Sequence, residues 1–294
     1  MDFPLVSVPN VSEGRDTETI AAIGAAFASH ARLLDVHSDA DHNRSVYTLV
    51  AEDGDLVESL LAGIAAAAEH IDLRDHEGVH PCIGAADVIP LVPLRLEDMG
   101  RAQAAALLVA RRVGEEFDLP VFLYGELALG RGPAFFRRGG RGELQRRLAA
   151  GELLPDFGPP WLDERAGGVI VGARRPLIAF NVNLLTQDVE VAKAIATAVR
   201  ETGGGFPGVR ALGLALPRAG LTQVSMNVED HEQAPLHEIV ARIEAEAAAR
   251  GVEVAGSELV GLLPAGAALP AAAAALRLPP LDRSRVLELR LLEG

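Results

Sequence analysis

The sequence predicts an α+β fold made of two copies of one strand-helix-strand-strand-helix-strand unit. Short stretches rich in valine and leucine alternate with alanine-rich stretches whose apolar residues recur at helical spacing, and this order occurs twice. The closing stretches of the two copies, GAADVIPLVP (84–93) and GSELVGLLP (256–264), also resemble each other. The order is that of the split, ferredoxin-like βαββαβ unit. We therefore expect a duplicated pair of such subdomains with a ligand cleft between them.

The first copy begins with a short apolar strand that ends at Asn10. The next helix can be capped by Asp16 or Thr17, because a side-chain oxygen there accepts a hydrogen bond from a free N–H group of the first turn. A second helix is expected to begin near Asp55. The predicted segments are, in order, strand 3–11, helix 17–30, strands 32–38 and 45–51, the helix from Asp55 and strand 84–93.

The second copy contains a clear strand pattern. Val224, Met226 and Val228 alternate with polar residues, as expected for a strand with one buried face. The first helix of this copy ends at glycines, which are common at helix C-termini. The predicted segments are, in order, strand 176–185, helix 188–204, strands 209–216 and 222–230, helix 234–251 and strand 256–264.

Residues 95–175 separate the two copies. They contain a predicted helix at 101–117, a strand at 120–127 and then a stretch rich in glycine, arginine and proline. We place the domain boundary at Arg174–Arg175. This gives an N-terminal subdomain of residues 1–174 and a C-terminal subdomain of residues 175–294.

Composition limits the classes of function. The 294 residues are 49% hydrophobic, which is enough for a sizeable core, and 41 acids against 27 bases give a formal charge of −14. A chain this acidic is a poor binder of nucleic acid or of an anionic membrane. Its one cysteine excludes an intramolecular disulfide and a cysteine-rich metal site.

Neither a signal peptide nor a membrane span is predicted. The N-terminus carries an acid at position 2 and lacks a long apolar region. Residues 259–276 are uncharged, but prolines and glycines interrupt them and alanine makes them weakly apolar. We expect a buried strand, a turn and a short helix there, and a cytoplasmic protein with no membrane contact.

The stretch RDHEGVHPCIG (74–84) contains H-E-x-x-H, a spacing that on a helix supplies two zinc ligands and the general base of a metallopeptidase. Gly78 disfavours a helix here, and Pro81 pushes His80 into extended backbone geometry. A histidine in a loop anchored before a buried strand suits acid-base chemistry instead. The structural alternative is a histidine that hydrogen bonds within the loop satisfy. We predict no metal at this motif.

A second polar run, DVHSDADHNRS (35–45), brings acids and histidines together. His37, Asp39, Asp41 and His42 have the residue types of a divalent-cation site. Asp and Asn are also typical of hairpin turns, and we favour a solvated hairpin loop. A third interpretation, in which the loop presents polar groups to an organic ligand, stays open.

Seven stretches in one order along the chain resemble a known family. They are SVPNVSEGRD, LLDVHSDADHNRSVYTLV, IDLRDHEGVHPCIGAADVIPLVPL, PVFLYGE, PDFGP, VGARRPLIAFNVNLL and GSELVGLLP. Together they resemble glutamate formimidoyltransferase, the transferase portion of the formimidoyltransferase-cyclodeaminase family. The resemblance implies transfer of a formimidoyl group between N-formimidoyl-L-glutamate and tetrahydrofolate, a step of histidine degradation. It also implies two α/β subdomains, the folate co-substrate in a tunnel between them, and a homodimer. We expect no metal cofactor.

The resemblance assigns roles to particular residues. The catalytic histidine of the family lies in a motif that reads HPCIGA here, so the implied catalytic residue is His80. Relatives commonly have arginine where this chain has Cys82; if that arginine aids a carboxylate or orients the histidine, another base must replace it. No cyclodeaminase activity is expected from this chain. The implied folate-binding segment is GPPWLDERAG, which consists of Gly158, Pro159, Pro160, Trp161, Leu162, Asp163, Glu164, Arg165, Ala166 and Gly167.

The implied chemistry needs both a base and an acid. An amine attacks an amidine-like carbon, and the tetrahedral intermediate then expels the other amine, so one proton must be taken and one supplied. A histidine with a pKa near neutrality can do both in turn, which makes His80 the general base and then the general acid. No covalent enzyme intermediate is needed, and Cys82 has no evident role as a nucleophile.

The carboxylates of the substrates require local positive charge in this acidic chain. Arg44, Arg174 and Arg175 are candidates, because a guanidinium can bind a carboxylate through two hydrogen bonds. The most basic stretch is a further candidate, although a solvated surface loop, ordered or disordered, explains it at least as well. Its arginines are Arg131, Arg137, Arg138, Arg141, Arg146 and Arg147. Polar candidates near strand ends, which turn or capping roles explain almost as well, are Asn10, Asn43 and Asn183.

Two other functions remain open at this point. Formyl transfer from a formyl-folate to glutamate uses similar groups, and the sequence does not separate it from formimidoyl transfer. A folate-binding module without turnover is the second alternative, because Cys82 replaces a base that relatives commonly have.

Overall fold

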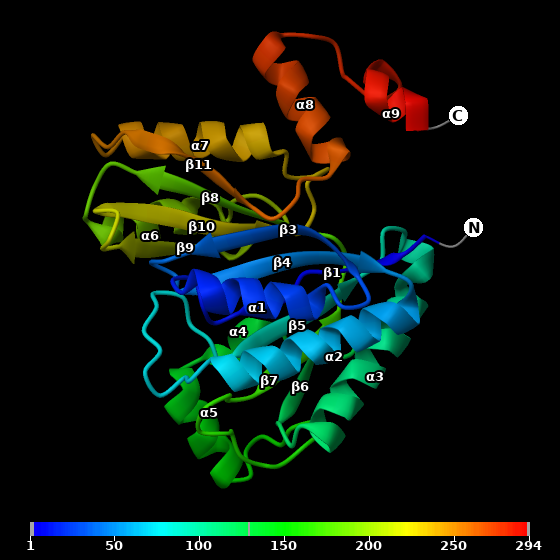
Figure 1. Ribbon diagram of the computed structural model, residues 1–294. Coiled ribbons are helices and arrows are strands. Elements are labelled where there is room, and N and C mark those ends of the chain that lie inside the picture. Colours follow the sequence, from blue (N-terminus) through cyan, green and yellow to red (C-terminus); the bar gives the residue numbers. More distant parts are fainter. Residues whose placement is uncertain (1–2, 129, 293–294) are drawn as a thin grey trace. The chain divides into compact units, whose positions relative to one another are not determined.

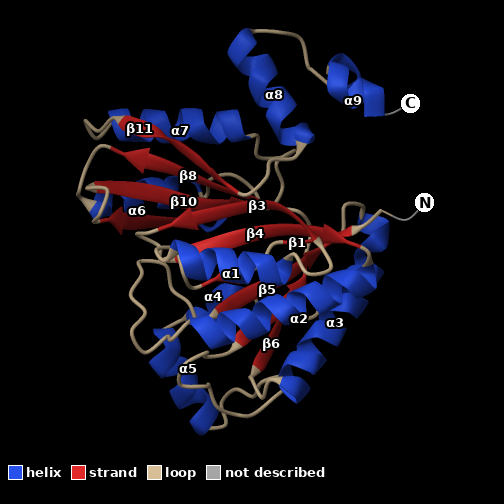
Figure 2. Ribbon diagram, in the orientation of Figure 1, coloured by secondary structure: helices blue, strands red, loops and turns tan. Residues whose placement is uncertain are grey.

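The computed structural model describes residues 3–128 and 130–292 (Figure 1). The chain forms two compact units, Met1–Pro176 and Leu177–Gly294. Each unit contains one β-sheet together with helices that pack on it (Figure 2). The α+β class predicted from the sequence is therefore confirmed.

The first part of the N-terminal unit has the predicted order of elements. The expected first strand is interrupted at Pro9, which has no backbone N–H to donate, and so forms two short strands that pair with the same neighbours. Asp16 caps the first helix, as one of the two predicted caps, by accepting a hydrogen bond from the N–H of Glu18. The elements are β1 (Leu5–Ser7), β2 (Asn10–Val11), α1 (Thr17–Phe27), β3 (Arg32–Asp39), β4 (Arg44–Ala51), α2 (Asp53–His70) and β5 (Ala86–Val92).

The insertion extends this sheet to seven strands. β7 pairs in parallel with both β5 and β6. The sequence pattern predicts β6 but not β7, because all five residues of β7 are buried and show no alternation. The added elements are η1 (Leu96–Asp98), α3 (Met99–Glu116), β6 (Val121–Gly125), α4 (Pro133–Arg137), α5 (Gly140–Ala149) and β7 (Val169–Ala173).

Most of the arginine-rich stretch 131–147 is helical, in α4 and α5, so its interpretation as a surface loop is wrong. Gly139 separates α4 from α5. Its φ of 79° lies in the left-handed region, which a residue with a side chain would adopt only with strain. Phe136, Leu144 and Leu148 are buried against the sheet face opposite to α1, α2 and α3. Leu144 and Leu148 lie four residues apart on α5, a helical spacing that the surrounding arginines obscure in the sequence.

The C-terminal unit also has the predicted order strand, helix, two strands, helix, strand. Its four strands are antiparallel, in the order β11-β8-β10-β9. Val224, Met226 and Val228 of β10 are buried as predicted, in a core shared with α6 and α7. The elements are β8 (Ile178–Leu184), α6 (Val189–Val199), η2 (Glu201–Gly203), β9 (Val209–Leu216), β10 (Leu221–Val228), α7 (Leu236–Ala248), β11 (Val254–Val260), α8 (Ala265–Leu276), η3 (Arg283–Arg285) and α9 (Leu287–Leu292).

The stretch 259–276 contains the end of a strand, a turn and a helix, but its predicted burial is wrong. β11 is only partly buried, and within α8 only Ala267 and Ala273 are buried. An alanine side chain covers little apolar surface, so the helix gains little by burial. Within the described ranges, no helix combines the length and apolar character that crossing a membrane requires.

Candidate active site

The H-E-x-x-H stretch lies in the loop between α2 and β5, residues 71–85, called the His80 loop below. α2 ends at His70 and no helix follows before β5, so the predicted loop is confirmed. His76 and His80 therefore do not share a helix face, and the zinc-peptidase interpretation loses its geometric basis. Among residues 3–128 and 130–292, no group of three or more His, Cys, Asp or Glu side chains is placed to hold a metal ion.

The turn between β3 and β4 holds the His80 loop in place. Asn43 has a φ of 49°, a left-handed conformation that asparagine adopts in turns, and its side chain donates a hydrogen bond to the carbonyl of Glu77 at 3.1 Å. The N–H of Val79 donates to the carbonyl of Asp41 at 3.0 Å. The turn thus fixes the backbone on both sides of Gly78.

The polar run 35–45 forms the predicted hairpin, but its turn is not solvated. Asp41, His42 and Asn43 are 8%, 8% and 6% exposed. They are covered because the His80 loop lies against the turn. The turn therefore contacts and positions the His80 loop, and it is not exposed to solvent as the prediction required.

A buried carboxylate lies near the start of β5. Asp87 is 0% exposed, and its Oδ1 accepts the backbone N–H of Ile83 at 2.8 Å. Its Oδ2 accepts hydrogen bonds from Arg44 Nη1 at 3.0 Å and from Arg137 Nη2. Asn10 fixes Arg44 further, since its Oδ1 accepts from Nε and Nη2 at 2.9 and 2.6 Å. Asp87, Arg44 and Arg137 are called the Asp87 cluster below; it joins β4, β5 and α4 to the His80 loop.

His80 meets this cluster through Arg44, whose Nη1 lies 3.1 Å from Nδ1 of the ring. The ring of His42 lies edge-on to that of His80, with 6.0 Å between their centroids. Burial lowers the pKa of His80 well below its ordinary value, and the positive charges of Arg44 and Arg137 lower it further. His80 is therefore a neutral imidazole at neutral pH.

The same surroundings set the charge of the neighbouring groups. Burial alone would raise the pKa of Asp87, but Arg137 and Arg44 outweigh burial and hold that pKa below its ordinary value. Burial and the charge of Arg137 lower the pKa of Arg44 to about 10, which leaves it protonated at neutral pH. Burial, and next the charge of Asp87, raises the pKa of the Cys82 thiol above its ordinary value. Cys82 is therefore a thiol and not a nucleophilic thiolate.

The Asp87 cluster carries an excess of positive charge, because two guanidiniums share one carboxylate. Arg137 Nε is buried and has no hydrogen-bond partner among the described residues. Leaving a buried donor without an acceptor is costly, so an anion that reaches this nitrogen would be bound favourably. The cluster thus suits a carboxylate ligand next to a neutral histidine.

Segment 158–167 is tied to both ends of the His80 loop. The N–H of Leu73 donates to the carbonyl of Arg165, and the N–H of Ala85 to the carbonyl of Ala166, both at 2.8 Å. These bonds bring the predicted folate segment and the predicted catalytic loop together, although they are far apart in the sequence.

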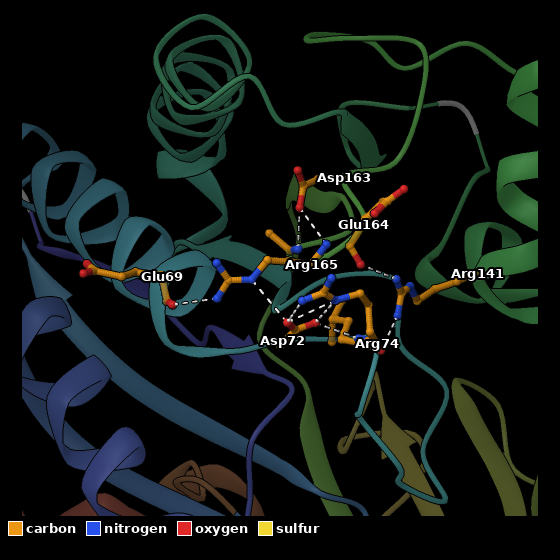
Figure 3. A network of polar contacts seen from close by, with 9 residues as sticks. Glu69, Asp72, Arg74, Arg141, Asp163, Glu164 and Arg165 are labelled. Atoms are coloured by element: carbon orange, nitrogen blue, oxygen red, sulfur yellow. Dashed lines mark hydrogen bonds and ion pairs between the residues drawn. The ribbon is translucent and has the colours of Figure 1, made fainter.

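Arg141 of α5 reinforces this connection (Figure 3). Its Nη1 donates to the carbonyl of Leu73 at 2.6 Å, and its Nη2 to the carbonyl of Glu164 at 3.0 Å. Nearby, Arg165 Nε lies 3.3 Å from Asp72 Oδ2. Arg141, one arginine of the basic stretch, thus holds the backbone of the His80 loop and of segment 158–167 in place.

An open pocket of about 580 Å³ lies beside this segment. Trp161 lines it and is 53% exposed, whereas tryptophan side chains are on average highly buried. The volume is within the range of small-molecule sites. The remaining lining residues are Arg141, Gly142, Gln145, Leu162, Asp163 and Glu164.

The structure brings several of the predicted polar residues together at His80, namely Arg44, Arg137 and Asn10, with Asn43 behind the loop. Other candidates lie elsewhere. Arg146 pairs with Glu143 and Glu152, Arg131 and Arg147 lie over the ring of Phe135, Arg174 donates to the carbonyl of Arg175, and Asn183 of the C-terminal unit accepts from Gln223.

Asp87 was not among the site residues predicted from the sequence. The available signal was a single charged residue inside the otherwise apolar strand predicted at 84–93. A buried carboxylate needs partners, so such a residue indicates paired bases nearby.

Two family models together match most of the chain. The model described as "Formiminotransferase domain, N-terminal subdomain" matches residues 5–174. The model described as "Formiminotransferase domain" matches residues 179–278.

Relatives with known names extend this similarity. The chain is 40% identical over 292 residues to a glutamate formimidoyltransferase of Thermoplasma acidophilum, across 96% of this chain and 95% of that protein. It is 37% identical over 291 residues to a glutamate formimidoyltransferase of Streptococcus pyogenes serotype M1, across 97% of each. It is 42% identical over 278 residues to a formimidoyltransferase-cyclodeaminase of Sus scrofa, across 90% of this chain and 51% of that protein.

The lowered pKa of His80 predicts a pH dependence of stability. The folded state binds fewer protons than the unfolded state below about pH 6.5, so the free energy of unfolding falls as the pH falls, by up to about 1.4 kcal/mol per pH unit. His80→Gln should make this fall smaller when denaturant unfolding is compared at about pH 7 and about pH 5.5. The matched control is His30→Gln, at an exposed site. An unchanged slope in His80→Gln would contradict the assignment.

Proposed function

The chain belongs to the formiminotransferase family, and we propose that it is a glutamate formimidoyltransferase, which moves a formimidoyl group between N-formimidoyl-L-glutamate and tetrahydrofolate. The observation that carries the proposal is the similarity, over nearly the whole chain, to two relatives of that name. The neutral His80 beside an excess of arginine charge supports it, since the transfer needs a base next to a carboxylate-bearing substrate.

His80 takes and returns one proton in the proposed reaction. As a neutral imidazole it accepts the proton of the amine that attacks the formimidoyl carbon. The imidazolium that forms is a strong acid, because burial and two arginines disfavour it, and it readily protonates the leaving nitrogen. The two halves of the reaction therefore use the same residue, and no covalent intermediate with Cys82 is required.

Arg137 and Arg44 bind a carboxylate of the glutamate portion. Arg137 supplies the buried Nε that lacks a partner among the described residues. Relatives commonly have arginine at the position of Cys82, and the proposal assigns its electrostatic role to these two arginines, which reach the same site from β4 and α4.

Segment 158–167 binds tetrahydrofolate, which is a co-substrate. The exposed Trp161 offers a flat apolar face on which an aromatic ring can stack, and the pocket beside it has a suitable size. The backbone bonds from this segment to Leu73 and Ala85 keep it next to the His80 loop. A folate bound there would lie close to the loop that contains His80, the residue that transfers the proton.

Further features implied by the resemblance remain proposals. They are two transferase subdomains at residues 1–174 and 175–294, a homodimer, a cytoplasmic location and no metal or nucleic-acid partner. Formyl transfer is the second candidate reaction, because the same residues would serve it.

The proposed activity predicts turnover that depends on His80. Purified protein mixed with N-formimidoyl-L-glutamate and tetrahydrofolate should form formimidoyl-folate, and His80→Ala should lower kcat on the order of 100- to 10,000-fold, the range expected when acid-base catalysis is lost. His76→Ala is the matched control in the same loop. Turnover that survives in His80→Ala would contradict the mechanism. Turnover only with formyl-folate and glutamate would assign formyl transfer instead.

The folate assignment predicts a direct optical signal. Trp161 is the only tryptophan of the chain, so its fluorescence should change saturably when tetrahydrofolate binds. Trp161→Ala should raise the Kd for tetrahydrofolate, measured by equilibrium dialysis, by about two- to thirteenfold, because a stacking contact contributes roughly 0.5–1.5 kcal/mol. Leu154→Ala, at a site 64% exposed and outside the pocket lining, should leave the Kd unchanged. A Kd insensitive to Trp161 would place the folate elsewhere.

A further inference from the structure

Asp87 does more than balance charge. We propose, resting on the function above, that Asp87 is a positioning residue for His80: through Arg44 it fixes the ring proton on Nε2 and keeps Nδ1 covered until a substrate carboxylate arrives.

The two oxygens of Asp87 hold the two partners of this contact. Oδ1 accepts the N–H of Ile83, which fixes the loop three residues after His80. Oδ2 accepts Nη1 of Arg44, and the same nitrogen lies 3.1 Å from Nδ1 of His80. One buried side chain therefore sets both the position of the ring and the position of the guanidinium that meets it.

The tautomer of His80 follows from the chemistry of its partner. A guanidinium has N–H donors and no acceptor, so Nδ1 must accept from Arg44 and carries no proton. A neutral imidazole has one N–H, and that N–H is therefore on Nε2.

The order of the groups decides the effect on the ring. In a carboxylate-imidazole pair, the carboxylate stabilises the protonated ring. Here Arg44 stands between Asp87 and His80, so the ring faces a positive charge, which adds to burial in keeping it neutral. The other charged or titrating groups that act on the ring are Arg137 from α4 and His42 from the hairpin turn.

This arrangement makes the base dependent on substrate. Nδ1 holds the only lone pair of the neutral ring, and Arg44 covers it. A carboxylate of the glutamate portion competes for the N–H of Arg44 and uncovers Nδ1. The attacking nitrogen then forms its bond to carbon as its proton passes to Nδ1, and the same proton later leaves for the departing nitrogen as its bond to carbon breaks.

The first test is read on the unmodified protein, and a variant serves only to assign its spectrum. The ¹⁵N chemical shifts of the His80 ring, assigned by difference from His80→Ala, report which nitrogen carries the proton. We expect an unprotonated Nδ1 and a protonated Nε2 without ligand, and a shifted Nδ1 resonance on addition of L-glutamate. A protonated Nδ1, or an Nδ1 resonance that glutamate leaves unchanged, would overturn the proposal.

The second test separates positioning from folding. Asp87→Asn keeps an acceptor for Ile83 but removes the charge that anchors Arg44. It should lower kcat on the order of 10- to 100-fold, as expected when a catalytic group is misplaced, and it should mix the two His80 tautomers. Asp98→Asn is the matched control, because Asp98 is 7% exposed and pairs with Arg95 and Arg101 away from His80.

The outcomes remain distinguishable from failure of the proposed function. An unchanged kcat and unchanged tautomer in a folded Asp87→Asn would overturn the proposal. If Asp87→Asn does not fold, the ¹⁵N shifts of His80 in the unmodified protein, without ligand and with L-glutamate, still decide whether the proposal holds. If the unmodified protein has no transferase activity, the proposed function fails, while the same shifts decide whether Arg44 covers Nδ1.

Discussion

The candidate site depends on one buried carboxylate and the cations that compensate it. Moving an ion out of water costs several kcal/mol unless partners replace the lost hydration. Asp87, with no exposed surface, obtains these partners from two arginines and a backbone N–H. Because the arginines come from β4 and α4 and the N–H from the His80 loop, satisfying this carboxylate fixes three separate segments relative to one another.

The same compensation creates the chemistry. Two cations for one anion leave positive charge in a chain whose formal charge is −14, which is the local field that an anionic substrate needs. Burial, and next that charge, lowers the pKa of the neighbouring His80 and keeps it neutral. One arrangement therefore has two results. It keeps the base, His80, unprotonated, and it provides an adjacent site for a carboxylate.

Local patterns predicted the parts of the fold that depend on local interactions. The cap at Asp16, the hairpin after β3 and the alternation in β10 follow from near neighbours, and all three are present. β7 was missed because both its faces are buried, and α4 and α5 were obscured by arginines. The resemblance to a family supplied His80 and segment 158–167, but the Asp87 cluster joins residues far apart in the sequence. Only the folded sheet brings its members together.

The pH dependence of kcat/KM for formimidoyl transfer tests this account most directly. If burial and the arginines keep His80 neutral, kcat/KM should stay level from about pH 8 down through pH 6.5 and fall only at lower pH. Ionisation of the substrates, titrated separately, is subtracted from the profile. A decline with a midpoint at or above about pH 6.5, the ordinary range of histidine, would contradict the claim that the Asp87 cluster governs the catalytic base.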